Sequence, residues 1–267
     1  MKDIINIVKI GGNVIDSPEA LEQFLTQLAA MEGRKILVHG GGKEASRLSR
    51  SMGIEPVMIE GRRVTDRATL DLVTMVYAGL INKRIVARLQ SLGCDAVGLT
   101  GADGNAIPAT RRSALPVDYG YVGDIDPKQV NAAWVLSLVG EGRVPVFCAL
   151  CHDGAGSMLN CNADTIAASL ARALCATERV RLTYCFEKPG VMTDVSDDST
   201  VIPLVTAAGF VRLRHEGLVS SGMIPKLQNA LDSAAAGVEE VRICRAEDLL
   251  GTGGTVIRYD SDEAAAL

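Results

Sequence analysis

Short apolar runs alternate with helical patterns along almost the whole chain of 267 residues. Runs such as 4–10 and 180–185 have the length of buried strands, whereas the stretch 17–28 repeats its apolar residues with the period of a helix. A regular alternation of strand and helix is typical of parallel sheets whose strands are joined by helices. The sequence therefore predicts an α/β fold with a mainly parallel sheet.

The individual elements can be placed from the same pattern. We expect strands at 4–10, 36–38, 144–147, 180–185 and 241–244. We expect helices at 17–28, 43–52, 127–139, 164–174 and 225–236, and two helical stretches between 67 and 92. Gly61 separates two short runs that predict a hairpin at the margin of the sheet, in a position suited to a lid. The segment 101–124 is predicted to be irregular or antiparallel β, and the whole chain to form one domain with two lobes divided near residue 175.

Charge and cysteine content exclude several classes of protein. The net charge is −5 and the isoelectric point is near 5.3, which argues against a broad basic surface for nucleic acid. No apolar stretch approaches the roughly 20 residues that span a bilayer, and the first residues lack the layout of a signal peptide. Seven scattered cysteines, an odd number, point to a reducing cytoplasm.

Two lysines near opposite ends of the chain stand beside glycine. Lys9 ends an apolar run just before Gly11 and Gly12, and Lys226 closes the segment 222–226 at the start of a helical pattern. A third glycine cluster, 40–42, again follows an apolar run. A buried lysine is costly without a partner anion, and a glycine loop before a helix lets backbone N–H groups approach an anion. Together these segments predict phosphate chemistry.

A dinucleotide site is the first alternative for the glycine cluster. Gly40, Gly42 and Ala45 satisfy G-x-G-x-x-A, and Glu60 lies near the expected acidic position. However, Glu60 falls in the predicted hairpin, and the match follows the second strand rather than the first. The segment also fails the Walker A pattern, because no serine or threonine follows Lys43.

Two further segments carry polar or sulfur side chains. Residues 148–152 match C-x-x-C-H, a haem attachment signature, but haem attachment needs an exported chain, and zinc would need more ligands than Cys161 alone can add. Incidental core thiols are the preferred interpretation. The segment 160–164 places two amides and a carboxylate before a helix, which suits either a helix cap or a polar ligand.

Taken in order, five segments resemble the signatures of the amino acid kinase family: 9–12, 39–42, 61–65, 160–164 and 222–226. The arginine hairpin, combined with N-x-N-A-D and G-M-I-x-K, is typical of the acetylglutamate branch of that family. The resemblance covers essentially the whole chain. It implies a three-layer αβα sandwich with a mainly parallel central sheet of about eight strands, in which 1–175 binds the acylated amino acid and mediates dimerisation and 176–267 binds ATP.

The resemblance also implies roles for single residues. Lys9 and Lys226 are expected to neutralise charge on the transferring phosphoryl group, and Asp164 to orient both lysines. The expected substrate contacts are Gly41, Gly42, Arg63 and Asn160. The expected nucleotide contacts are Gly11, Gly12, Glu187, Gly190, Leu218, Ser220 and Gly222.

The implied reaction is phosphorylation of the γ-carboxylate of an N-acyl-L-glutamate by ATP, within arginine biosynthesis. Mg²⁺ is expected to bind through the ATP phosphates, with no protein metal site of its own. The acyl group stays open between acetyl and succinyl, because the cysteine-bearing segments 148–152 and 161 lie on the expected substrate wall. The chain begins at its first strand, so the resemblance implies a cytoplasmic homodimer without arginine feedback. The alternatives are another substrate of the family, such as aspartate, carbamate or UMP, and a non-catalytic sensor of amino acids or nucleotides.

Overall fold

A single eight-stranded sheet forms the centre of the protein in a computed structural model, which describes residues 3–219 and 222–259. Its strands run in the order β12-β14-β13-β11-β1-β2-β8-β5, and every neighbouring pair is parallel except β13 and β14. Their bounds are β1 Ile5–Ile10, β2 Arg34–His39, β5 Ala96–Leu99, β8 Val144–Cys148, β11 Val180–Phe186, β12 Leu204–Val205, β13 Glu240–Arg245 and β14 Thr255–Ile257. The predicted parallel α/β sheet is confirmed.

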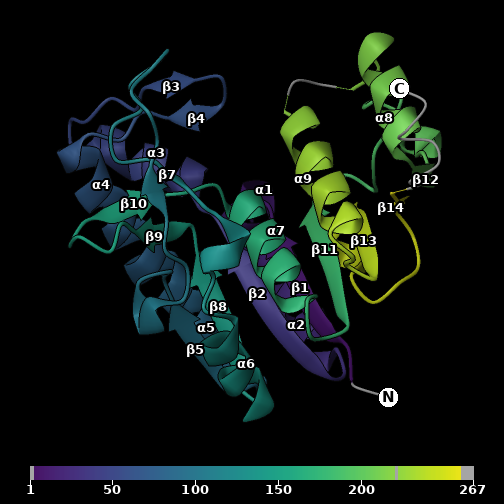
Figure 1. The fold of residues 1–267 in the computed structure, drawn as a ribbon, viewed down its shortest axis with the longest axis horizontal. Coiled ribbons are helices and arrows are strands. Elements are labelled where there is room, and N and C mark those ends of the chain that lie inside the picture. The colour runs from purple at the N-terminus through teal and green to yellow at the C-terminus, as the bar shows by residue number, and fades with distance from the viewer. Residues whose placement is uncertain (1–2, 220–221, 260–267) are drawn as a thin grey trace.

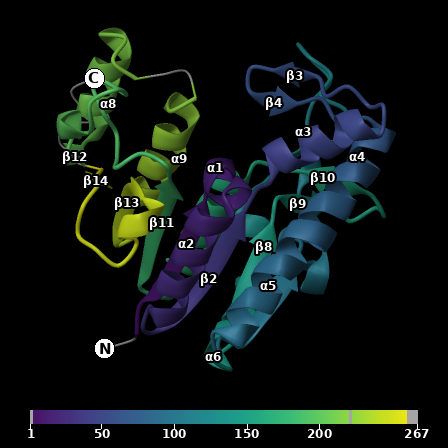
Figure 2. The same cartoon turned by 180° about the vertical axis from the view of Figure 1, so that it is seen from behind.

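Helices cover both faces of this sheet, which gives the three layers. Helices α6, α7 and α9 lie on one face (Figure 1), and α2 and α5 lie on the other (Figure 2). The helices are α1 Gly12–Asp16, α2 Pro18–Ala30, α3 Gly42–Ser51, α4 Arg67–Thr74, α5 Asn82–Ser91, α6 Ala132–Gly140, α7 Ala163–Leu174, α8 Ala207–His215 and α9 Ile224–Ala235. Among the described residues, no helix is both long and apolar enough to cross a membrane.

Local chemistry explains how α2 is held at both of its ends. At its start, the Ser17 hydroxyl accepts a hydrogen bond from the Ala20 amide, and Pro18 occupies the first helical position. At its end, the buried ammonium of Lys35 donates to the carbonyls of Leu28, Ala29 and Met31. Those carbonyls have no partner within the helix, so Lys35 on β2 ties the end of α2 to the sheet.

Three two-stranded ribbons surround the cleft end of the sheet. The predicted hairpin is confirmed as the antiparallel pair β3 and β4, in which Arg63 lies opposite Met58. The segment 101–124 contributes the antiparallel pair β6 and β7, as expected. A third pair, β9 and β10, was not predicted and continues the chain after β8. The ribbons are β3 Met58–Ile59, β4 Arg62–Arg63, β6 Thr110–Arg111, β7 Gly123–Asp124, β9 Leu150–His152 and β10 Met158–Asn160.

Two helical predictions need correction. The stretches between 67 and 92 are not separated, because a π-helical segment, Met75–Ile81, joins α4 to α5. The helix predicted at 127–139 begins later: Pro127–Gln129 forms only a 3₁₀ turn, and Val130 is extended. Helix α6 then starts at Ala132, where the side chain of Asn131 accepts a hydrogen bond from the Trp134 amide. An asparagine cap therefore determines this helix start, rather than the upstream proline.

Candidate active site

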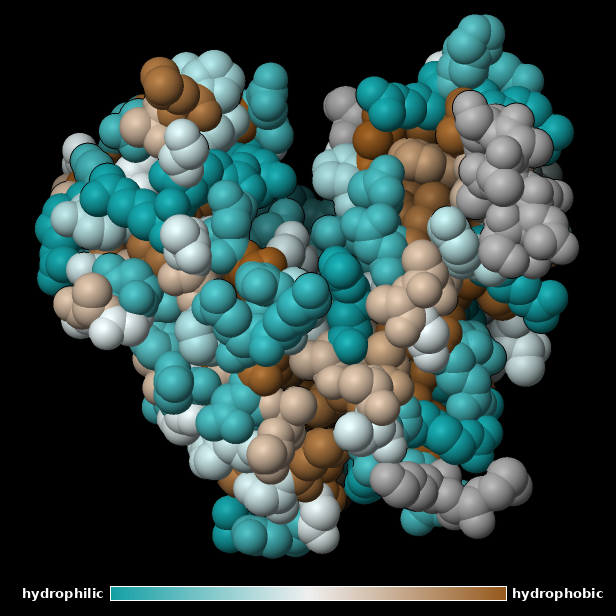
Figure 3. All heavy atoms as spheres, in the orientation of Figure 1, coloured by the Kyte–Doolittle hydropathy of each residue, from teal (hydrophilic) through white to brown (hydrophobic). Residues whose placement is uncertain are grey.

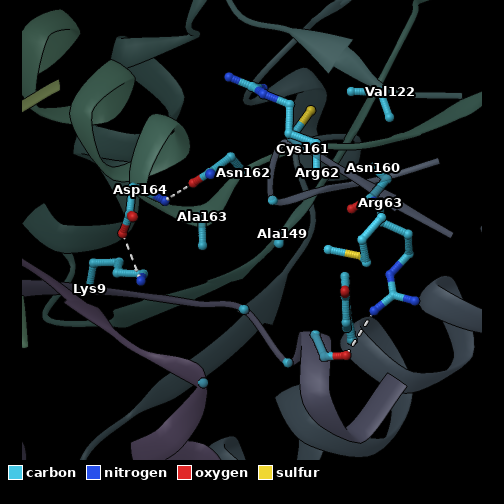
Figure 4. A pocket seen from close by; sticks show the side chains of 17 residues that line it. Lys9, Arg62, Arg63, Val122, Ala149, Asn160, Cys161, Asn162, Ala163 and Asp164 are labelled. Atoms are coloured by element: carbon cyan, nitrogen blue, oxygen red, sulfur yellow. Dashed lines mark hydrogen bonds and ion pairs between the residues drawn. The ribbon is translucent and has the colours of Figure 1, made fainter. Parts of the chain in front are cut away.

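The space-filling view shows a cleft between the two upper parts of the molecule (Figure 3). The hairpin β3–β4 lies on one side of it, at the end of the sheet where β1, β2 and β8 finish (Figure 1). Within it lies a cavity of about 380 Å³, which we call cavity 1. Most of the residues predicted for catalysis and substrate binding line it, together with several others (Figure 4). The lining consists of Lys9, Gly12, Gly40, Gly41, Gly42, Met58, Gly61, Arg62, Arg63, Tyr77, Val122, Ala149, Asn160, Cys161, Asn162, Ala163 and Asp164.

One carboxylate bridges the two lysines that stood apart in the sequence. The Lys9 ammonium lies 2.7 Å from Oδ1 of Asp164, and the Lys226 ammonium lies 2.8 Å from Oδ2. Lys9 is the penultimate residue of β1, Asp164 lies in the first turn of α7, and Lys226 lies in the first turn of α9. We call these three residues the charged cluster, and with both lysines protonated its net charge is +1.

Burial and the shared carboxylate set the charge states of the cluster. Burial alone would raise the pKa of Asp164, but Lys9 and Lys226 together outweigh it and hold that pKa well below its ordinary value. For Lys9, burial is the largest influence and lowers the pKa, and the positive charge of Lys226 lowers it further. Asp164 is therefore an anion under all physiological conditions, and Lys9 has a weaker hold on its proton than an exposed lysine.

The backbone of the glycine loop before α3 is in close contact with buried side chains of β2 and of the segment that joins α4 to α5. Gly41 has φ of +149°, and a Cβ there would lie 2.2 Å from Cδ1 of Ile81, so only glycine fits. His39 is fully buried; its Nδ1 donates to the Gly40 carbonyl (2.8 Å), and its Nε2 accepts from the Asn82 amide (3.0 Å). Burial lowers the pKa of His39 to about 4, so the ring is neutral and supports the loop without adding charge.

Arg63 and Asn160 line cavity 1 on the side away from Lys9 and Asp164 (Figure 4). Arg63 is 6% exposed, and its Nη2 donates to the Gly42 carbonyl and to the Ser46 hydroxyl, both at 2.8 Å. Its Nη1 is buried, with no partner among the described residues. The Asn160 amide donates to Thr65, whose hydroxyl donates in turn to the Arg63 carbonyl. Arg63 therefore lines cavity 1 with one guanidinium nitrogen unpaired among the described residues, and a guanidinium is a suitable partner for a carboxylate.

A second cavity of about 420 Å³, cavity 2, is lined by part of the predicted nucleotide site and by Phe186, whose ring lies 5.9 Å from the Lys226 ammonium. Gly190 and Leu218 line it, but Glu187, Gly222 and Gly11 do not. Gly11 instead caps the start of α1, its amide bonded to the Cys185 carbonyl. Ser220 lies outside the described residues. The lining of cavity 2 is Phe186, Lys188, Gly190, Val191, Met192, Thr193, Asp194, Val195, Gly217, Leu218, Val219 and Met223.

Three aromatic residues of the site were missed by the sequence analysis. Tyr77 lines cavity 1 from the π-helical segment, next to Gly42. Tyr184 and Phe186 of β11 lie under Lys226, with its ammonium 5.6 and 5.9 Å from the two ring centres. Tyr184 and Phe186 belong to an apolar strand run, where an aromatic residue is as readily explained by the core as by a site. Tyr77 could have been noticed, because its hydroxyl is a polar group among the apolar residues of a predicted helix.

The cysteines of the C-x-x-C-H segment are core residues. Cys148 and Cys151 are fully buried, and burial raises the pKa of both thiols, that of Cys148 to about 12. Protonated thiols are poor metal ligands. Within residues 3–219 and 222–259, no three His, Cys, Asp or Glu side chains are grouped to hold a metal ion. Cys161 differs from the other two because it lies on the wall of cavity 1.

Comparisons with known proteins agree with this geometry. The model of the amino acid kinase family matches residues 5–245. Acetylglutamate kinase of Phocaeicola vulgatus is 49% identical over 258 residues, which are 97% of this chain and 100% of the relative. Acetylglutamate kinase of Bacteroides fragilis is 48% identical, with 97% of this chain and 98% of the relative covered.

Solved structures show the same architecture. The protein smu.665 of Streptococcus mutans superposes with a TM-score of 0.79 at 27% identity, over 96% of this chain and 99% of its own. The central sheet and its flanking helices are thus shared along the full length of that protein.

Proposed function

Because the chain belongs to the amino acid kinase family, we propose that it transfers the γ-phosphoryl group of ATP to the γ-carboxylate of N-acetyl-L-glutamate. The product is an acyl phosphate, formed in a step of arginine biosynthesis. The observation that carries the proposal is the charged cluster, in which two lysines share Asp164. Lys9 and Asp164 line cavity 1, and the Lys226 ammonium lies 5.9 Å from the ring of Phe186, a residue that lines cavity 2. One net positive charge near both cavities suits the transfer of an anionic group from one ligand to the other.

The chemistry needs no general base, because the attacking carboxylate is already a nucleophile. One of its oxygens forms a bond to the γ-phosphorus as the bond from that phosphorus to the bridging oxygen of ADP breaks. Negative charge spreads over the phosphoryl oxygens during this step, and Lys9 and Lys226 neutralise it from fixed positions. Asp164 holds both ammonium groups in place, and the backbone amides of Gly41 and Gly42 assist from the start of α3.

We place the nucleotide in cavity 2 and the acyl amino acid in cavity 1. Phe186 supports this placement, because its side chain lines cavity 2 while its ring lies 5.9 Å from the Lys226 ammonium. Mg²⁺ would be held through the nucleotide rather than by protein side chains, and when bound it would supply charge neutralisation there. In cavity 1, the free Nη1 of Arg63 would bind the α-carboxylate, with Asn160 beside it. Residues 1–175 then form the amino-acid lobe and 176–267 the nucleotide lobe.

The assembly and location follow from the resemblance rather than from the geometry. We propose a homodimer that works in the cytoplasm. The cysteines support the location, since all seven are unbridged and six of them are buried.

Coupled ADP release tests the proposal with MgATP and N-acetylglutamate, free glutamate, aspartate and carbamate as acceptors. We expect turnover with the acylated glutamate alone. Lys226→Ala is expected to lower kcat by about 10²–10³-fold with a much smaller change in KM, because its charge acts in the transition state. Binding of both ligands without ADP release would indicate a sensor, and near-normal kcat in Lys226→Ala would refute the mechanism.

A further inference from the structure

Arg62 is the one cation on the wall of cavity 1 that the proposed mechanism leaves without a role. It precedes Arg63 on β4 and lines the cavity as a half-buried side chain. Successive residues of a strand point in opposite directions, and Figure 4 shows Arg62 and Arg63 leaving the hairpin on opposite sides. Arg62 therefore does not share the α-carboxylate site that we assign to Arg63.

The charged groups around Arg62 do not neutralise it. Among the described residues it makes no hydrogen bond and no ion pair. Asp124 is a carboxylate whose charge acts on Arg62, but its side chain is half-exposed and Arg112 binds both of its oxygens through Nε, at 3.0 and 3.1 Å. Glu60 on the hairpin turn is exposed, and Tyr119 lies under Arg112. Burial and the charge of Arg112 lower the pKa of Arg62 and outweigh Asp124, Tyr119 and Glu60, which raise it, so the guanidinium is partly desolvated.

The acyl group of the substrate can be placed against the wall that carries Arg62. With the α-carboxylate assigned to Arg63 and the γ-carboxylate to the charged cluster, we direct the substituent on the α-nitrogen towards the side of Arg62, which neither assignment uses. The wall on the Arg62 side carries Val122 and Cys161 (Figure 4). These two side chains suit the methylene part of an acyl chain, and a guanidinium suits an anion at its end.

We propose that cavity 1 prefers N-acyl-L-glutamates whose acyl chain ends in a second carboxylate, and that Arg62 binds that carboxylate. This rests on the proposed kinase function and extends its substrate class from N-acetyl-L-glutamate to N-acyl-L-glutamates with a longer, charged acyl chain. The shortest chain that adds one methylene and a carboxylate to the acetyl group is succinyl. A volume of about 380 Å³ leaves room for it, since small-molecule sites typically occupy about 300–1,000 Å³.

The test compares kcat/KM for N-succinyl-L-glutamate and its N-succinamoyl analogue, in which a neutral amide replaces the terminal carboxylate. Both compounds have the same length and the same glutamate part, so the ratio isolates the terminal charge. We expect the succinyl compound to be favoured by about 10- to 100-fold, as for a hydrogen-bonded charge pair in a partly desolvated site. Arg62→Leu should reduce the ratio to about threefold or less, and Arg62→Lys should retain part of it. Arg67→Leu, which removes an exposed arginine of α4, should leave the ratio unchanged.

Each result distinguishes the two proposals. Equal turnover of the succinyl and succinamoyl compounds, with N-acetylglutamate active, would overturn the role of Arg62 and leave the kinase function standing. An equal loss on both compounds in Arg62→Leu would show that Arg62 binds a group common to them, which also overturns it. If no acylated glutamate is turned over, the kinase function fails; calorimetric binding of the same two compounds to wild type and Arg62→Leu then decides the preference independently.

Discussion

Asp164→Asn is the most informative single change, because it removes the only negative charge of the charged cluster and little else. The side chain is 15% exposed, and its two oxygens lie 2.7 Å from Lys9 and 2.8 Å from Lys226. Asparagine has nearly the same shape, so the packing around α7 is preserved. In the variant, the ammonium groups of Lys9 and Lys226 lie close together without a counter-charge.

The cost follows from these distances. At an effective dielectric constant of about 20, each charge pair contributes about 6 kcal/mol before desolvation is counted. Breaking a buried pair typically costs about 3–5 kcal/mol net, because the remaining charge is left buried. Asp164→Asn breaks two such pairs, but we expect the total loss of stability to stay in the range for one. Burial has already lowered the pKa of Lys9, so Lys9 can lose its proton and leave only one uncompensated charge.

Urea unfolding near neutral pH, with and without a saturating non-hydrolysable ATP analogue and Mg²⁺, measures this effect. The phosphates bring back negative charge, so the analogue should stabilise Asp164→Asn by at least about 1 kcal/mol more than wild type. The control is Asp71→Asn, which breaks the exposed 3.3 Å pair with Arg67 and should cost about 0–1 kcal/mol. If Asp164→Asn unfolds within about 1 kcal/mol of wild type, and the analogue stabilises both equally, the charge argument is wrong.

Three further changes test separate parts of the site. Arg63→Ala should raise KM for the acyl amino acid by about 10- to 100-fold, with a smaller effect on kcat. The reason is that it removes a charged hydrogen-bond donor from the ground state as well as from the transition state. Steady-state kinetics at saturating ATP measures both constants. Gly41→Ala should destabilise the fold by about 1–3 kcal/mol, because the added Cβ would overlap Ile81. Thermal unfolding measures this loss of stability. A melting temperature equal to that of wild type would contradict the close approach of Ile81 to this loop. The kcat of wild type should fall on the alkaline side below the ordinary lysine pKa, because Lys9 loses its proton there; in Lys9→Arg, whose side chain stays charged, this limb of the pH profile should move to higher pH.

Segments with a strong local signal were predictable from sequence. Ser17 followed by Pro18 begins α2 where the pattern places a helix start, and Gly61 turns the hairpin at φ of +74°. The lysine and glycine segments were also predicted to share one ligand, and the structure brings Lys9 and Lys226 onto a single carboxylate. These features depend on neighbouring residues, or on the rule that parallel strands end at one edge of a sheet.

Features that depend on tertiary contacts were not predictable. The π-helical segment lies where Ile81 and Tyr77 pack against Gly41, a contact that no local pattern records. Of the predicted nucleotide contacts, Gly190 and Leu218 line cavity 2, whereas Glu187 is exposed outside it. The loops after β11 are irregular, so no local pattern predicts which of their residues line a cavity. Arg62 likewise lacks a carboxylate partner because Arg112, fifty residues later in the sequence, binds Asp124.

The architecture itself explains why a single carboxylate stands among so many donors. Four helices begin near the cleft, with the N-cap residues Gly11, Gly41, Asn162 and Met223. Each helix start adds unpaired N–H groups and partial positive charge to that of the two lysines. Such a site would repel its own lysines if it were left without an anion. Asp164 supplies that anion in the unliganded protein, and because it binds one edge of each ammonium group, their other protons stay available to a phosphoryl group. The residue that stabilises the resting site is thus also the one that aligns it for transfer, which is why its replacement should affect stability and kcat together.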